Sequence, residues 1–145
     1  MYKGKPTKGL EFYRLLETSE IFTSELGKVI LASGKLEAEL INLLERHNVS
    51  SGFKNATLGR LINISEQNNI LNDNDLISLK MLKEQRNYIM HNIYGLFVDL
   101  KDETILEKHN LFDTDVELYI EKAWQLKENL NSLSAIISKK NKDYI

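Results

Sequence analysis

The residues best suited to chemistry in this sequence are Arg86, Asn87 and His91, which lie within six positions of one another. An arginine presents a fixed fork of donors that fits a phosphate or a carboxylate, and a histidine can give or take a proton near neutral pH. The hydrophobic pattern predicts a helix over residues 73–95, begun by Asp73 or Asn74, with these residues near its C-terminal end. They therefore form one candidate site.

The helical projection gives Arg86 an unusual environment. At 100° per residue Arg86 lies in the middle of an apolar stripe, whose members within about 60° are Leu79, Leu82, Ile89, Met90 and Ile93. A guanidinium there costs free energy unless it is paired or meets water, so its position needs an explanation. Asn87, His91 and Tyr94 follow as an i, i+4, i+7 ridge beside it.

Most other catalytic signatures are missing from the sequence, and a serine triad cannot be identified from sequence alone. It contains no cysteine, which excludes disulfides, thiolate metal ligands and cysteine nucleophiles. There is no phosphate-binding loop, GxGxxG or HExxH motif, and the histidines at 47, 91 and 109 do not have metal-ligand spacing. We therefore expect neither a metal nor a cofactor.

Size and composition favour one all-α domain. The chain has 145 residues, one proline and a net charge of −2, which argues against nucleic-acid binding by bulk electrostatics. We expect residues 1–8 and 140–145 to be loose tails. No apolar run resembles a signal peptide or a membrane span, so we expect a cytoplasmic protein without membrane contact.

Further helices are predicted over residues 10–16, 20–47, 57–64 and 114–139. Two of them carry apolar seams in steps of four and three, typical of an up-and-down bundle of four to five helices. The first seam is Phe22, Leu26, Val29, Ser33, Leu36, Leu40, Leu43 and His47, and the second is Tyr119, Ala123, Leu126, Leu130, Leu133 and Ile137.

Several local features carry expectations of their own. Gly27 and Gly34 indicate a kink or a close helix crossing. Glu37 and Glu39 lie off the seam, either in solvent or within reach of Arg86. Residues 65–69 predict a helix break. The pattern over 96–111 fits a strand, a helix or a loop. Residues 114–117 have the capping-box pattern that begins the last helix.

The stretch RNYIMHNIY, in the third main helix, resembles the motif of the HEPN superfamily, in which an arginine, a polar residue, further residues and a histidine form the site. The resemblance covers residues 20–140, with ASGKLEAELINLLERHN as the long helix and ATLGRLI as the short connecting one. It implies a metal-independent endoribonuclease of a microbial defence or toxin–antitoxin system. Such proteins are homodimers in which two motifs share one cleft.

The resemblance also implies a role for each residue. His91 would act as general base or acid, Arg86 would hold the scissile phosphate, and Asn87 would orient one of them. Cleavage would leave 2′,3′-cyclic phosphate and 5′-hydroxyl ends. In toxins paired with a nucleotidyltransferase antitoxin, a modified tyrosine lies two residues after the histidine, but here Ile93 occupies that place and Tyr94 follows.

Two other interpretations remain open. One is a non-catalytic HEPN-like interaction domain that binds a protein partner or a nucleotide. The other is a helical scaffold in which Arg86 pairs with a buried carboxylate, while Asn87 and His91 cap the helix end. The candidate partners are therefore RNA, a second copy of the chain, and a cognate antitoxin or regulatory protein.

Overall fold

Helices are the only regular secondary structure among the described residues. The computed structural model describes residues 13–49, 53, 55–91 and 111–143, and the side chains of residues 91 and 111–115 lie outside that description. Residues 13–18 are helical, and no strand occurs in the described part, so the predicted all-α helical bundle is confirmed. The main elements are α2 (Glu20–Arg46), α3 (Leu58–Gln67), α4 (Asp73–His91) and α6 (Leu111–Asp143).

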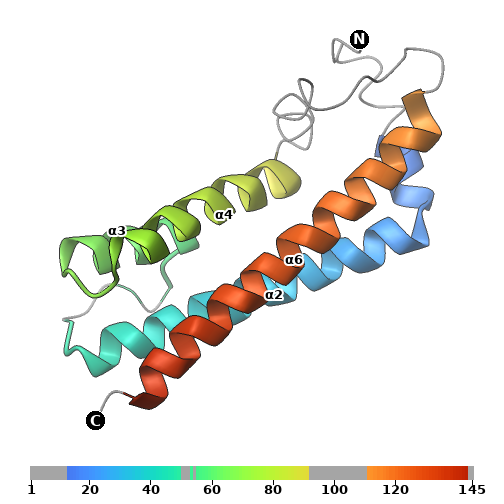
Figure 1. The fold of residues 1–145 in the computed structure, drawn as a ribbon. Coiled ribbons are helices and arrows are strands. Elements are labelled where there is room, and N and C mark those ends of the chain that lie inside the picture. The colour runs from blue at the N-terminus through green and yellow to red at the C-terminus, as the bar shows by residue number, and fades with distance from the viewer. Residues whose placement is uncertain (1–12, 50–52, 54, 92–110, 144–145) are drawn as a thin grey trace.

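The helices α2 and α6 lie side by side and run in the same direction, while α4 returns in the opposite direction and α3 lies between α2 and α4 in the chain (Figure 1). Two contacts define the register of the parallel pair. Lys127 Nζ donates to Glu25 Oε2 at 2.9 Å, and Asn141 Nδ2 donates to Glu39 Oε2 at 2.8 Å. Each contact joins residues 102 positions apart, which is the constant offset of parallel helices.

The two predicted seams form the centre of the core. Every residue of the α6 seam is buried, and six of the eight α2 seam positions are buried. Leu26 is half-buried, and His47 is exposed because it lies past the end of α2 as its C-cap, so the seam is one residue shorter than predicted. Each fully buried leucine contributes roughly 2 kcal/mol by leaving water. The other helices add Leu58, Leu61, Ile62, Leu79, Leu82 and Ile89.

Caps explain where α2 and α3 begin. Ser19 Oγ accepts from Phe22 N at 3.1 Å, and Thr57 Oγ1 accepts from Arg60 N at 3.4 Å, as their side-chain types predict. The predicted helix break over residues 65–69 begins later than expected, because α3 continues to Gln67 and Asn68 is its C-cap. Ser65 is buried inside α3 and donates its hydroxyl to Leu61 O at 2.8 Å, which satisfies it within the helix.

The start of α4 agrees with the sequence, since the helix begins at Asp73 and Asn72 Oδ1 accepts from Asp75 N at 2.8 Å. The predicted limits of α6 are wrong at both ends. It begins at Leu111, so the residues 114–117 lie inside the helix rather than at a cap.

Lys140 and Asn141 of α6 contact the bundle and the helix continues to Asp143, so the expectation of a loose tail from residue 140 is wrong for this part of the chain. Lys140 Nζ lies 3.4 Å from Asp75 Oδ2, and Asn141 is only 5% exposed. Tertiary contacts thus extend the helix beyond its apolar seam. Residues 1–8, 92–95, 96–110 and 144–145, on which the sequence also carries expectations, lie outside the described residues.

The glycines of α2 do not mark a close helix crossing. A Cβ built on Gly27 or Gly34 would meet nothing within 4 Å in the described part of the chain. That interpretation of the sequence is therefore wrong, and space for a methyl group is present at both positions.

None of the helices in the described part of the chain has the length and apolar character that crossing a bilayer requires.

The open space beside Gly34 predicts that Gly34→Ala raises the free energy of unfolding by roughly 0.5–1 kcal/mol, because alanine restricts the unfolded chain and fits the helix. Urea denaturation followed by circular dichroism measures the change. Gly59→Ala is the control, since its Cβ would lie 3.2 Å from Lys83 Cδ and some of the gain would be lost. Destabilisation by Gly34→Ala would show that a neighbour occupies this space.

The contact between Glu25 and Lys127 predicts a pH-dependent contribution to stability. The hydrogen bond from Lys127 lowers the pKa of Glu25 below its ordinary 4.5, partly opposed by burial. Stability from this carboxylate is therefore present above that value and is lost as the pH falls through the lower pKa of the folded state. Glu25→Gln should lower the free energy of unfolding by about 1 kcal/mol at pH 7, with a smaller difference in acid.

Denaturation from pH 3 to 7 tests this expectation. Glu66→Gln serves as the matched control, because Glu66 pairs with Lys80 on the surface, where both side chains are nearly half exposed. Equal losses in the two variants would contradict a special contribution from Glu25.

Candidate functional site

The helix α4 places Arg86 on the side that packs into the bundle. Its stripe neighbours Leu79, Leu82 and Ile89 are 0%, 3% and 5% exposed, and Arg86 itself is half-buried. The sequence-based prediction of a cation on the apolar stripe is therefore confirmed. Met90 differs, because it is 40% exposed and lies where α4 approaches the end of its described part.

The guanidinium of Arg86 is only partly satisfied. Its Nε is buried and has no hydrogen-bond partner among the described residues. A buried donor in this state carries a desolvation cost of about 1–3 kcal/mol, and more where the group is charged. Arg86 therefore keeps hydrogen-bonding capacity that the described fold does not use.

Two half-buried carboxylates of α2 have partners other than Arg86. Glu39 accepts a hydrogen bond from Asn141, and Glu25 accepts one from Lys127. In the described part of the chain no ion pair involves Arg86. The interpretation in which Arg86 pairs with a buried carboxylate therefore finds no support in the described residues.

The helix register also separates Glu37 from Arg86. With the offset of 102 residues between α2 and α6, Glu37 lies opposite Lys139, next to the Lys140 that contacts Asp75 on α4. At a rise of about 1.5 Å per residue, Arg86 is about 16 Å further along α4 than Asp75. The structure thus does not bring these two predicted residues together.

The remaining predicted residues lie along or beyond the end of α4. Asn87 is exposed, and it follows Arg86 at a turn of about 100° around the helix. His91 is the last residue of α4, about 7.5 Å along the axis from Arg86, and its side chain is outside the described part. Tyr94 also lies outside it. The described residues contain no group of three side chains that could hold a metal ion.

An apolar groove between α4 and α6 lies beside the motif helix and was not predicted. It has a volume of about 230 Å³ and is lined by Ser78, Met81, Leu82, Asn129, Leu133 and Ile136. Nearby Ile77 is 65% exposed, and Met81 is 51% exposed. These two residues are four positions apart and lie off the main apolar stripe of α4. This spacing is the sequence signal that could have revealed a second apolar face.

None of the protein-family models, curated proteins and solved structures compared with this chain matches it.

The unpaired state of Arg86 predicts that Arg86→Met keeps the free energy of unfolding within about 1 kcal/mol of the native value or raises it. Methionine preserves the packing of the stem and removes a partly desolvated charge. Lys127→Met is the contrasting variant and should cost about 2 kcal/mol, because Glu25 then loses its main partner. Chemical denaturation measures both changes. A loss of about 3 kcal/mol for Arg86→Met would reveal a buried ion pair of Arg86.

Proposed function

We propose that this chain is a metal-independent endoribonuclease that cleaves RNA to 2′,3′-cyclic phosphate and 5′-hydroxyl ends. The observation that carries the proposal is the half-buried Arg86, whose Nε has no hydrogen-bond partner among the described residues, five residues before His91 on one helix. Stability alone does not explain a cation in this position. The resemblance of RNYIMHNIY to the HEPN motif supplies the reaction class.

The proposed chemistry assigns a role to each of the three motif residues. His91 in its neutral form takes the proton from the ribose 2′-hydroxyl, and the resulting oxygen attacks the adjacent phosphorus. The bond from phosphorus to the 5′-oxygen breaks, and a protonated imidazole gives that oxygen its proton. Arg86 donates two hydrogen bonds to the non-bridging oxygens as their charge grows, and Asn87 orients the phosphate.

The proposal extends to the assembly and the biological setting. Two copies of the chain would bring their motif helices together, so that two Arg86–His91 pairs share one cleft. A ribonuclease of this kind would act in the cytoplasm, in microbial defence or as a toxin, with a cognate antitoxin or regulatory protein as partner. The lack of cysteine is compatible with a reducing compartment.

A second candidate function is a non-catalytic interaction domain of the same superfamily. The apolar groove between α4 and α6, with Met81 and Ile136 about half exposed at its edge, favours this candidate. Exposed apolar surface rimmed by polar groups is typical of protein-binding sites. Here the groove residues Asn129 and Ser78 supply the polar groups.

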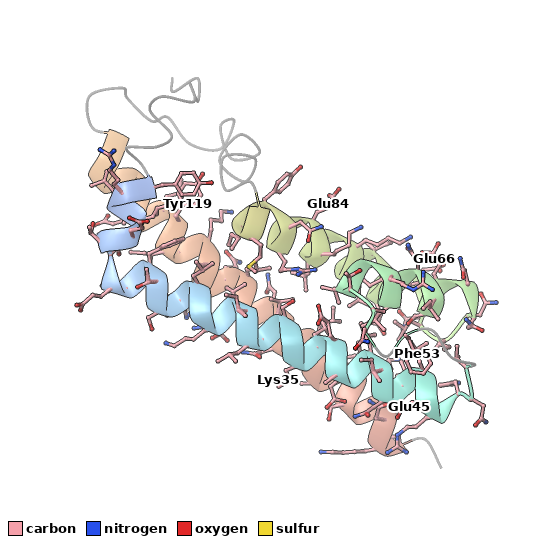
Figure 2. The ribbon with its side chains drawn as sticks, turned by 180° about the vertical axis from the view of Figure 1, so that it is seen from behind. Lys35, Glu45, Phe53, Glu66, Glu84 and Tyr119 are labelled. Atoms are coloured by element: carbon pink, nitrogen blue, oxygen red, sulfur yellow. The ribbon has the colours of Figure 1, made fainter. Side chains whose placement is uncertain are left out.

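The test is cleavage of a mixed set of labelled RNAs in the presence of EDTA. The native protein should produce cyclic-phosphate ends, and His91→Ala and Arg86→Ala should each reduce the rate by at least about 100-fold. Glu84→Ala is the control on the same helix, because Glu84 is exposed and takes no part in the proposed chemistry (Figure 2). Circular dichroism and sedimentation confirm equal folding and equal oligomeric state.

Each result separates the two candidates. Cleavage that disappears in both motif variants and persists in Glu84→Ala supports the ribonuclease. Absence of cleavage by a folded native protein on all RNAs rejects it in favour of the interaction domain.

A further inference from the structure

A second groove lies between the parallel helices α2 and α6. It has a volume of about 440 Å³, within the usual range of ligand sites. Its α2 wall is a helical stripe of Lys28, Leu31 and Lys35, and its α6 wall includes Lys127, Glu128 and Asn131. Figure 2 shows Lys35 on the side of α2 away from α3 and α4. The groove is therefore separate from the Arg86 site.

The groove carries an excess of positive charge. Among the described residues its three lysines form ion pairs with two carboxylates, those of Glu128 in the lining and Glu25 beside it. Lys35 belongs to no ion pair of the described residues and is exposed. One positive charge is left over in a chain whose net charge is −2, which gives an anion a preferred place on this surface.

The floor of the groove is held in place by contacts within the protein. The side chain of Lys127 is 13% exposed, 2.9 Å from Glu25 and 5.8 Å from the ring centre of Trp124. Lys28 Nζ lies 3.5 Å from the other oxygen of Glu25. The two oxygens of Glu25 thus hold both ammonium groups at the groove, and the hydrogen bond from Lys127 is the main cause of the lowered pKa of Glu25. Such fixed donors lower the ordering cost of binding.

The spacing of the lysines indicates an elongated anion. Lys28 and Lys35 are seven residues apart on one face of α2, which is about 10 Å along the helix axis. A single small anion reaches one of them, whereas a chain of linked phosphates can contact both ends and the central Lys127. Ammonium groups bind phosphate oxygens as strong point charges, and Asn131 offers a neutral amide donor beside them.

We propose that the α2–α6 groove binds an anion with two or more linked phosphate groups, with Lys28 and Lys35 at its ends and Lys127 at its floor. The phosphate chain can belong to inorganic polyphosphate or to a nucleotide. Leu31, which is 75% exposed, lies between the two end lysines and supplies an apolar contact for a nucleotide ring. This binding is independent of the proposed ribonuclease reaction.

The test is isothermal titration calorimetry of the full chain at about 50 mM salt, with inorganic tripolyphosphate, ATP and AMP as the three ligands. Tripolyphosphate should bind with saturation at one site per chain. Lys35→Glu should weaken its binding at least tenfold, and Glu128→Gln should strengthen it about threefold, as expected for charges at close range in a partly screened groove. Lys80→Glu makes the same charge change on α4 and should alter binding less than twofold.

Lys35→Glu should keep the native melting temperature, because Lys35 is exposed and unpaired among the described residues. Equal affinity for tripolyphosphate and ATP identifies the phosphate chain as the whole ligand. If ATP binds more tightly than tripolyphosphate and AMP binds weakly, the ligand is a nucleotide. No saturable binding of either polyphosphate overturns the proposal. An equal loss in Lys35→Glu and Lys80→Glu overturns it as well.

His91→Ala separates this proposal from the ribonuclease. Unchanged tripolyphosphate binding in that variant supports a site on α2 and α6, whether or not the native protein cleaves RNA. Loss of binding in His91→Ala would place the anion at the α4 motif and overturn the assignment to this groove.

Discussion

The parallel pairing of α2 with α6 is the constraint on which the rest of the structure depends. The half-buried contact between Glu25 and Lys127 and the contact between Glu39 and Asn141 define one register along the pair. Because the two helices run in the same direction, the chain between them has to return, and α4 makes that return (Figure 1). The C-terminal end of α4, with Arg86, is thereby carried toward the end of the bundle where α2 and α6 begin.

Arg86 shows a conflict between folding and chemistry. The hydrophobic pattern of α4 places Arg86 on the side of the helix that packs into the bundle. There its Nε has no hydrogen-bond acceptor among the described residues. Two half-buried carboxylates of α2, those of Glu25 and Glu39, are bound to Lys127 and Asn141. Departures of this kind from local rules are expected at functional or strained sites.

The helix α6 separates two surfaces of different character. One of its sides, with Asn129, Leu133 and Ile136, forms an apolar groove with α4. Another side, with Lys127 and Asn131, forms a charged groove with α2. Since these residues lie on different faces of one helix, the two grooves can serve different partners. An apolar groove suits a protein surface, and a groove with excess ammonium groups suits an anion.

The sequence by itself determined the helices and their buried faces. Apolar residues spaced three or four positions apart are enough to orient a helix, as in the seam from Tyr119 to Ile137. It also identified Arg86 as a cation on an apolar stripe. Only the tertiary structure decided that α6 continues past Asn141, that space is open beside Gly34, and that Glu37 is separated from Arg86. These depend on which residues of distant helices lie at the same level, and a periodic pattern carries no information on register between helices.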